Sequence, residues 1–336
     1  MLNIGIIGAG RIGKVHTQSI VNFVRTAKVT AIADPVITDE TAAWAQSLGI
    51  AKISKDYRDI LDDPDIGAVL ICSSTDTHSQ ISLEAIAAGK HIFCEKPIDH
   101  DVGRINAVLA ALAAPEAERL KYMVGFNRRF DHNFRAIRAA VESGQVGKVE
   151  LVKITSRDPA PPSAEYAARS GGIFLDMAIH DFDMVRYLSG EEVESVYVQP
   201  AVLVDPAIGE AGDFDSAVIT PKLSSGALAV IDNSRRCAYG YDQRAEVFGS
   251  LGSAASRNDA ASNVHVATTD GITAEKPLYF FLERYMQAFA TEVQEFIDAV
   301  VNDTPVPVDA QAGLAAVLIG IAATKSAKTG LPVKVG

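Results

Sequence analysis

Short runs of apolar, often β-branched residues alternate with longer helix-forming segments up to about Phe126. The apolar runs predict strands at Asn3–Ile7, Val29–Asp34, Ala68–Cys72, His91–Cys94 and Tyr122–Gly125. The segments between them predict helices at Ile12–Val24, Thr38–Leu48, Thr77–Ala88 and Asp101–Ala113. Strands joined by helices usually run parallel, and a run that is apolar throughout is typical of a strand covered on both faces. We therefore expect a parallel sheet between two layers of helices.

The pattern changes after about Val146. Strands with few helices between them are predicted at Glu150–Ser156, Val193–Val204, Ser216–Leu223, Ala227–Asn233 and Arg244–Gly249. Two further helices are predicted at Leu278–Val301 and Asp309–Ala327, and the pattern leaves open which part of the protein they pack against. We therefore expect an α/β protein of two domains, residues 1–126 and 127–336. The second is predicted to be an α+β domain with a large, open, mainly antiparallel sheet.

Length and composition agree with two folded domains. The chain has 336 residues, and domains average roughly 150 residues. Hydrophobic residues make up 48% and charged residues 22%, which is typical of globular proteins and not of disordered chains. The formal net charge is −11. Because this charge repels phosphate backbones and anionic lipid headgroups, we expect neither nucleic acids nor membrane surfaces as partners.

The cysteines and the apolar segments bear on the compartment. The three cysteines are widely spaced and contain no CxxC pair, so neither a disulfide framework nor a thiolate zinc site is expected. The chain enters a strand-like run directly after Met1, which is unlike a signal peptide. The longest run of small or apolar residues, Ala312–Ala323, is shorter than the roughly 20 residues of a membrane-spanning helix. We expect a cytoplasmic protein in which this run forms a buried helix.

The segment Gly8–Gly13 matches the GxGxxG fingerprint and lies between a predicted strand and a predicted helix. The first glycine of this motif permits a tight turn and the second lets the backbone approach a pyrophosphate. The third allows the helix to pack closely on the strand. Free N–H groups at the start of the helix then bind the anion. We expect Gly8, Gly10, Arg11 and Ile12 to contact a dinucleotide; the alternative is that the glycines only form a turn.

Asp34 ends the second predicted strand, 21 residues after Gly13. A carboxylate at about this distance accepts a hydrogen bond from the adenosine ribose 2′-OH. Neither Arg nor Lys follows in the segment Pro35–Thr38 to bind the 2′-phosphate of NADP. The sequence therefore predicts NAD as the cofactor. The alternative for Asp34 is a solvated side chain at the end of a strand.

Glu95, Lys96 and Pro97 follow the predicted strand His91–Cys94. Open α/β sheets bind their ligands at the carboxyl ends of the strands, and a lysine there can hydrogen-bond a substrate oxygen and stabilise a developing alkoxide. A proline biases the preceding residue away from helical angles, so Lys96 is expected in an extended segment. The alternative for Lys96 is an exposed charge without a catalytic role.

Asp176 and His180 are four residues apart in the segment Gly171–Met184, which places them on one face if the segment is an α-helix. A histidine beside a carboxylate can accept the proton of an alcohol, because imidazole titrates near neutral pH. One alternative is a core histidine that Asp176 stabilises. A metal site of His180, Asp181 and Asp183 is not expected, because the two aspartates would point away from His180 on a helix.

Taken together, the N-terminal fingerprint, the Glu95-Lys96-Pro97 motif and the segment Gly171–Met184 resemble the glucose–fructose oxidoreductase, inositol dehydrogenase and rhizopine-catabolism (Gfo/Idh/MocA) family. The resemblance extends over essentially the whole chain. It implies an N-terminal Rossmann domain with a doubly wound parallel sheet. It also implies a C-terminal domain whose open sheet forms one side of the active site and the interface of an oligomer, commonly a tetramer.

The resemblance also assigns roles to residues. Lys96, Asp176 and His180 correspond to the catalytic residues: His180 takes the hydroxyl proton, Lys96 steadies the oxygen, and Asp176 orients the histidine. The residues that correspond to the region along the cofactor are Ser73, Ser74, Thr75, His78, Glu95 and Lys96. Many members carry a proline in the Ser73–His78 region, which this chain lacks. His78 has the alternative of a capping or packing residue.

Three short motifs narrow the resemblance to inositol 2-dehydrogenases. They are the segment Gly125–Asp131, the loop Ser156–Pro159, and the segment Tyr239–Arg244 followed by Val247–Gly249. The implied reaction is the NAD-dependent oxidation of myo-inositol to 2-keto-myo-inositol, with substrate contacts from Arg128, Asp158 and Tyr239 in addition to the catalytic residues. A sibling enzyme acting on scyllo-inositol, glucose or another cyclic polyol is the nearest alternative. A non-catalytic NAD-binding redox sensor is the alternative from a different class.

Overall fold

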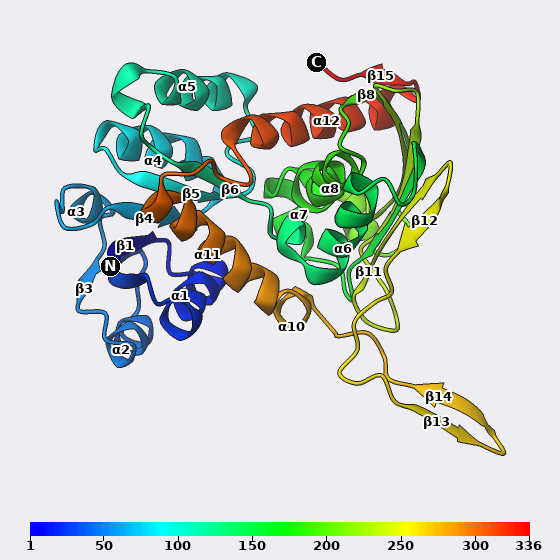
Figure 1. The fold of residues 1–336 in the computed structure, drawn as a ribbon, viewed down its shortest axis with the longest axis horizontal. Coiled ribbons are helices and arrows are strands. Elements are labelled where there is room, and N and C mark those ends of the chain that lie inside the picture. Colours follow the sequence, from blue (N-terminus) through cyan, green and yellow to red (C-terminus); the bar gives the residue numbers. More distant parts are fainter. The chain divides into compact units, whose positions relative to one another are not determined.

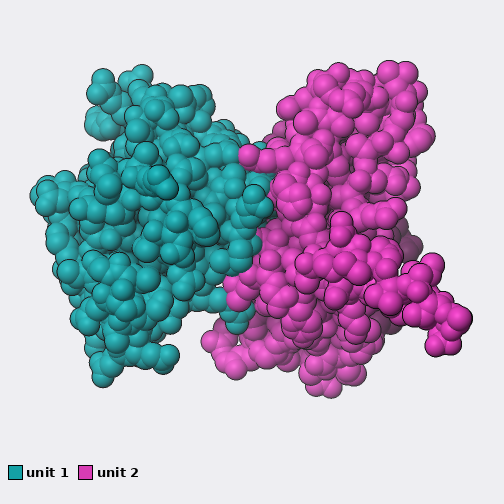
Figure 2. All heavy atoms as spheres, turned by 60° about the horizontal axis from the view of Figure 1, so that its bottom comes forward, with its two compact units in different colours: residues 1–130, 286–315 teal, residues 131–285, 316–336 magenta.

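A computed structural model describes residues 1–336 of the chain. The chain forms two compact units, which are coloured separately in Figure 2. Unit 1 comprises Met1–Phe130 and Met286–Ala315, and unit 2 comprises Asp131–Tyr285 and Ala316–Gly336. The first of the two C-terminal helices, whose packing the sequence left open, therefore belongs mainly to the N-terminal unit.

Unit 1 is built on a six-stranded parallel sheet with the strand order β3-β2-β1-β4-β5-β6. This is the doubly wound order of dinucleotide-binding domains. The strands are β1 (Leu2–Ile7), β2 (Ala27–Ala33), β3 (Lys52–Ser54), β4 (Ala68–Ile71), β5 (His91–Glu95) and β6 (Tyr122–Gly125). Every residue of β4 and β6 is buried, as expected for strands that are covered on both faces.

Helices cover both faces of this sheet (Figure 1). On one face α1 (Arg11–Phe23) packs against α11 (Met286–Asn302), and on the other α4 (Thr75–Ala87) packs against α5 (Val102–Leu112). The shorter helices are α2 (Asp39–Ser47), α3 (Arg58–Leu61), η1 (Pro115–Ala117) and η2 (Asn127–Phe130). Side chains define where α2 and α5 start, because Thr38 and Asp101 accept the N–H groups of Thr41 and Arg104.

Unit 2 contains a seven-stranded sheet with the order β12-β11-β7-β10-β9-β8-β15. Its strands are β7 (Val149–Arg157), β8 (Val193–Ala201), β9 (Ser216–Leu223), β10 (Leu228–Ser234), β11 (Asp242–Gly249), β12 (Gly252–Ala255) and β15 (Val333–Lys334). Neighbouring strands are antiparallel except β7 and β10, which run parallel. The expected fold class, a parallel sheet followed by a mainly antiparallel one, is confirmed.

Helices lie on one face of the seven-stranded sheet (Figure 1). Among them α8 (Ile179–Ser189) packs on β7 and α6 (His132–Glu142) packs on β11. The shorter helices of unit 2 are α7 (Ala164–Arg169), the π-helix η3 (Ile173–Met177), α9 (Pro206–Glu210) and α10 (Phe281–Arg284). Buried and exposed residues alternate along β9, so its second face is open in this chain.

Several elements differ from what the sequence predicted. The single helix expected at Leu278–Val301 is broken at Tyr285 into α10 and α11. At this break the Arg284 guanidinium turns inward and forms a buried ion pair with Asp131. A hairpin of β13 (His265–Thr268) and β14 (Gly271–Ala274), which the sequence pattern did not predict, is exposed at every residue.

The long C-terminal helix α12 (Ala310–Thr329) begins in unit 1 and ends in unit 2. By length and composition it is apolar enough to cross a membrane, with a mean hydropathy of 1.3 over its most apolar window. Of that window, 56% is buried inside the protein. Core helices commonly combine such a length with such a composition, so this helix is weak support for a membrane span.

Candidate active site

The fingerprint glycines form the turn between β1 and α1. Gly8 has a φ of +99°, and a Cβ there would lie 2.6 Å from the backbone of Cys72 and Ser73, so only glycine fits. A Cβ at Gly13 would collide with the carbonyl oxygen of Gly8, because α1 packs closely on the turn. A Cβ at Gly10 would have no atom within 4 Å. This open space lies at the start of α1, where free N–H groups suit a pyrophosphate.

Asp34 lies directly after β2 and contacts the fingerprint turn. Its Oδ2 accepts the N–H of Ala9 at 2.7 Å, and its Oδ1 accepts the N–H of Val36 at 2.9 Å. A carboxylate oxygen has two lone pairs, so each can accept a further hydrogen bond from a ribose hydroxyl. Arg11 and Ile12 occupy the first turn of α1. Unit 1 therefore brings the predicted ribose acid and the predicted phosphate turn together, in an arrangement that fits NAD.

Ser73 and Ser74 lie between β4 and α4, and Thr75 is the first residue of α4, at the same carboxyl edge of the sheet. The hydroxyl groups of Ser73 and Thr77 lie 2.7 Å apart, within hydrogen-bond distance. Ser73 and Thr75 are half-buried and Ser74 is exposed. The region predicted to line the cofactor is thus a short, polar turn beside Gly8.

His78 is buried and bridges two turns of unit 1. Its Nδ1 lies 2.8 Å from the carbonyl oxygen of Pro97, and its Nε2 lies 3.1 Å from that of Ser73. Because carbonyl oxygens only accept hydrogen bonds, both ring nitrogens must donate, as in an imidazolium. Burial alone would lower the pKa of His78, but the neighbouring Cys94 and these two carbonyl groups raise the pKa to about 9. His78 thereby ties the turn after β4 to the segment that carries Lys96.

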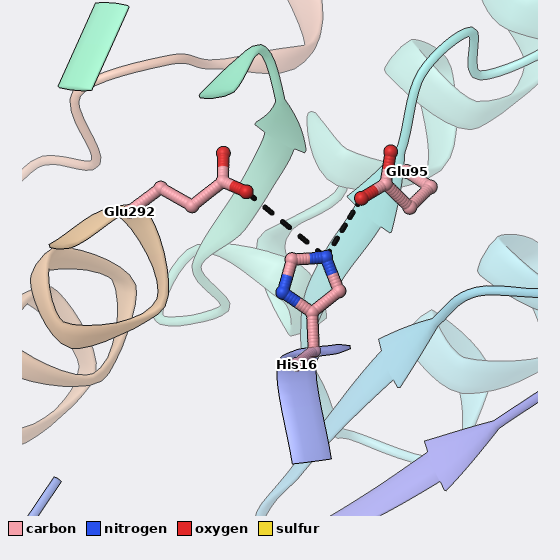
Figure 3. A group of neighbouring side chains, drawn as sticks. All are labelled: His16, Glu95 and Glu292. Atoms are coloured by element: carbon pink, nitrogen blue, oxygen red, sulfur yellow. Dashed lines mark hydrogen bonds and ion pairs between the residues drawn. The ribbon is translucent and has the colours of Figure 1, made fainter. Parts of the chain in front are cut away.

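Lys96 is half-buried directly after β5, and Glu95 before it points into the core. Glu95 Oε1 lies 2.7 Å from Nε2 of His16, and Oε2 accepts the backbone N–H of Lys96 at 3.2 Å. Figure 3 shows that Glu292 of α11 points at the same histidine nitrogen, 4.0 Å away. Burial and the charge of Glu95 raise the pKa of the Glu292 carboxyl well above its ordinary value. The predicted cofactor contact of Glu95 stays a prediction.

Asp176 and His180 lie in different helical segments of unit 2. Asp176 belongs to the π-helix η3 and His180 to the first turn of α8, and both are half-buried. The N–H of Ala178 donates to the carbonyl of Ile173 at 2.8 Å, a spacing of five residues. The premise of one continuous α-helix is therefore wrong, and the same-face argument does not apply to this pair. The wider turn begins where Asp213 accepts the N–H of Ile173 at 3.0 Å.

The structure adds Arg235 to the predicted site residues of unit 2. Its guanidinium donates to Asp176 Oδ2 at 3.0 Å and to Asp158 Oδ2 at 3.3 Å, so it brings these two predicted residues together. The hydroxyl of Tyr166 donates to the other oxygen of Asp176 at 3.1 Å. Strand alternation is the sequence signal that points to Arg235: continued past Asn233, it places every second residue on the same inward face.

Other predicted residues are placed as follows. Arg128 is buried in η2 of unit 1. Tyr239 is 42% exposed, and its hydroxyl donates to Asp242 at 2.6 Å and accepts from Arg157 at 3.3 Å. The Asp242 carboxylate and burial raise the pKa of Tyr239 to about 12. The substrate contacts of Arg128 and Tyr239 stay predictions.

Two groups of side chains have three possible metal-ligating atoms within 4.8 Å of one another. They are His16, Glu95 and Glu292 in unit 1, and Asp131, His132 and Asp259 in unit 2. Neither group contains His180. Asp181, which the metal alternative would require, accepts a hydrogen bond from the Asn233 amide at 2.8 Å.

Comparisons with known proteins cover nearly the whole chain. Residues 2–126 match the profile of an oxidoreductase family with an NAD-binding Rossmann fold, and residues 134–255 match the GFO/IDH/MocA C-terminal domain. The chain is 46% identical to myo-inositol 2-dehydrogenase of Thermotoga maritima, covering 97% of this chain and 96% of the relative. It is also 46% identical to inositol 2-dehydrogenase of Rhizobium meliloti, covering 96% of each.

A solved structure of scyllo-inositol dehydrogenase from Lactobacillus casei, with bound NAD(H) and scyllo-inositol, is similar over 100% of this chain and 99% of that one. The TM-score is 0.91 and the sequence identity 31%. Both domains of the family are therefore present, in order, in one chain with the NAD fingerprint intact. The protein belongs to the Gfo/Idh/MocA family of NAD-binding oxidoreductases.

Proposed function

We propose that this enzyme oxidises one ring hydroxyl of myo-inositol to the ketone, giving 2-keto-myo-inositol. The observation that carries this proposal is the 46% identity, over nearly the full length of both chains, to two proteins named as inositol 2-dehydrogenases. The two carboxylates that Arg235 joins support it, because a polyol offers several hydroxyl donors and needs matched acceptors.

In this proposal the chain's residues handle the hydroxyl that reacts. His180 accepts its proton, Lys96 donates a hydrogen bond to the oxygen as negative charge develops there, and Asp176 orients His180. Arg128, Asp158 and Tyr239 bind the other hydroxyl groups. Bound NAD supplies the hydride acceptor. The turn at Gly8–Gly13, Asp34 and the segment from Ser73 to His78 hold the cofactor, and the open space at Gly10 leaves room for its phosphates.

The open face of the seven-stranded sheet supports a homo-oligomer, which we propose to be a tetramer. Leu228, Leu151 and Phe248 are register partners across β10, β7 and β11, so they form one apolar row on that face. Leu228 is 53% and Phe248 45% exposed in the single chain. A second copy of the chain would cover this row. The three cysteines are buried free thiols, which suits a reducing cytoplasm.

Two alternatives remain to be distinguished by experiment. The first is a sibling enzyme that oxidises scyllo-inositol, and the likeness to the Lactobacillus casei structure is the observation behind it. A redox sensor would bind NAD through the same turn without turning over a polyol.

The test is an assay of the purified protein with NAD and a panel of myo-inositol, scyllo-inositol and glucose, followed by the absorbance of the reduced cofactor. We expect the highest kcat/KM with myo-inositol. A higher value with another polyol would replace the substrate in the proposal. Retained NAD binding without turnover of any polyol would support the alternative of a redox sensor.

A further inference from the structure

A single arginine of unit 2 is buried among carboxylates of the proposed substrate site. Arg235 is 4% exposed. It bonds Asp176 at 3.0 Å and Asp158 at 3.3 Å, and both bonds use the Oδ2 atom of the aspartate. Burial alone would lower the pKa of the guanidinium, but the charges of Asp176 and Asp158 reverse this and raise it. Arg235, Asp158 and Asp176 therefore form one ion-paired cluster.

A third carboxylate, that of Asp213, lies close to this ion-paired cluster. Asp213 accepts the N–H of Ile173 at 3.0 Å, at the start of the π-helix that carries Asp176. Burial raises the pKa of Asp213, and the charge of Asp176 adds to that effect. Carboxylates so close together repel one another unless a cation lies among them. Arg235 is the cation that the structure places there.

The backbone holds Arg235 in position independently of its side chain. The N–H of Arg235 donates to the carbonyl of Asp215 at 2.8 Å. Along the end of β10, Asn233 and Arg235 are buried and face the helices, while Arg236 is exposed. Asn233 bonds Asp181 of α8 at 2.8 Å. The strand end thus presents two inward polar groups to the segment that carries Asp176 and His180.

We propose that Arg235 is a positioning residue that holds Asp158 and Asp176 together as a paired acceptor for two hydroxyl groups of one cyclic polyol. This inference rests on the proposed function and deepens it, because the pair selects substrates with more than one hydroxyl. Arg235 acts through the two aspartates. The role of proton acceptor stays with His180.

The chain offers a matched control for testing this role. Arg236 is the next residue, is exposed and likewise follows the end of β10. The variants are R235Q and R235K, compared with R236Q and R236K. Lysine keeps the charge at position 235 but loses the planar fork that bonds two carboxylates at once.

For R235Q we expect kcat/KM with myo-inositol to fall roughly ten- to a hundredfold, mainly through KM, with NAD affinity unchanged. The acid limb of the pH profile of kcat/KM should move to higher pH, because Asp158 and Asp176 lose their positively charged neighbour. The other groups that face Asp176, Tyr166 and Asp213, are unchanged in this variant. R235K should return the acid limb toward the wild-type position and restore part of kcat/KM. A purely structural role would lower the yield of folded protein and leave the pH profile of the folded fraction unchanged.

The proposal is wrong if R235Q and R235K keep the wild-type kcat/KM and pH profile, or if the Arg236 variants lose as much. If R235Q does not fold, the kcat/KM and pH profile of R235K alone test the proposal. If wild-type enzyme oxidises none of the polyols, the proposed function fails. The titration of the Asp176 carboxyl, followed by carbon-13 NMR and assigned with D176N, then decides this inference separately. We expect a higher pKa of Asp176 in R235Q than in the wild type, and an unchanged value would overturn the inference.

Discussion

Neighbouring residues at the strand ends of this protein have opposite environments. At the end of β5, Glu95 points into the core toward His16, while Lys96 is only half-buried. At the end of β10, Arg235 is buried and Arg236 is exposed. In both cases the change falls at or just after the end of the strand, because β5 ends at Glu95 and β10 ends at Ser234. A short motif therefore combines a residue that supports the site with one that is available for chemistry.

Local motifs allowed several residues to be predicted from sequence, because the relevant neighbours are close in the chain. The turn at Gly8–Gly13 and the position of Lys96 after β5 are of this kind. Arg235 could not be assigned a partner, because Asp176 lies 59 residues earlier and only the folded sheet brings them together. His16 and Glu95 are 79 residues apart, and their bond likewise depends on tertiary structure.

At the residue scale, we predict that K96A or H180A lowers kcat by about 10²–10⁴-fold while the dissociation constant of NAD changes little. Both side chains are proposed to act on the hydroxyl and its proton, and that interaction is stronger in the transition state than in the ground state. Steady-state kinetics with myo-inositol and a fluorescence titration with NADH measure the two quantities. Exposed Lys55 and His265 provide the controls K55A and H265A. Wild-type kcat in either site variant would contradict the assignment.

The elements of the parallel sheet were predictable, because each strand is a continuous apolar run with a helix on either side. The strand Tyr122–Gly125 has the predicted bounds. The π-helix at Ile173–Met177 was not predicted, since its sequence reads as an ordinary helix and its spacing depends on Asp213. Helix α6 was also missed, although Asp131 caps it by accepting the N–H groups of Asn133 and Phe134.

Helix α11 introduces a buried acid into unit 1. Both carboxyl oxygens of Glu292 are buried without a hydrogen-bond partner, and the groups that face it are His16 and Glu95. The raised pKa means that the folded protein binds a proton there that the unfolded chain releases above its ordinary pKa of about 4.3. Stability from this group is therefore fully present below that pH and is lost as the pH rises toward the folded pKa.

We predict that E292Q makes stability less dependent on pH. The wild type should lose up to about 1.4 kcal/mol per pH unit through this group between the two pKa values, and the glutamine variant should not. Thermal unfolding at pH 5.5 and pH 7.5 measures the difference: the variant should gain most at pH 7.5. Exposed Glu210 at the end of α9 provides the control E210Q. If E292Q and E210Q change the pH dependence of stability equally, Glu292 is ionised in the folded protein and the prediction is wrong.

At the scale of the whole molecule, the two units are not consecutive segments of the chain. Residues 286–315 return to unit 1 after unit 2 has been built, and α12 then leads back into unit 2. A division of the sequence at a single point could not foresee this, because hydrophobic periodicity identifies a helix without identifying the surface on which it packs.

We predict that L228R shifts the protein from the proposed tetramer to smaller species. Leu228 belongs to the apolar row with Leu151 and Phe248, and an unpaired charge buried in an interface costs several kcal/mol. Size-exclusion chromatography with light scattering measures the mass in solution. V301R, at an exposed position near the end of α11, is the control. An unchanged mass for L228R would exclude this face from the interface.

The return of α11 to unit 1 has a consequence for the synthesis of the protein. Residues 1–130 leave the ribosome long before residues 286–302, and N-terminal domains generally fold first during translation. The centroids of the His16 and Phe289 rings are 5.8 Å apart, and Phe289 belongs to α11. Until α11 has been synthesised, this side of the His16 ring is not covered by that helix. The cofactor-binding unit can therefore mature only after most of the chain has been translated. A premature stop between residues 131 and 285 would remove α11 and leave the core of the cofactor-binding unit exposed to proteases and to aggregation.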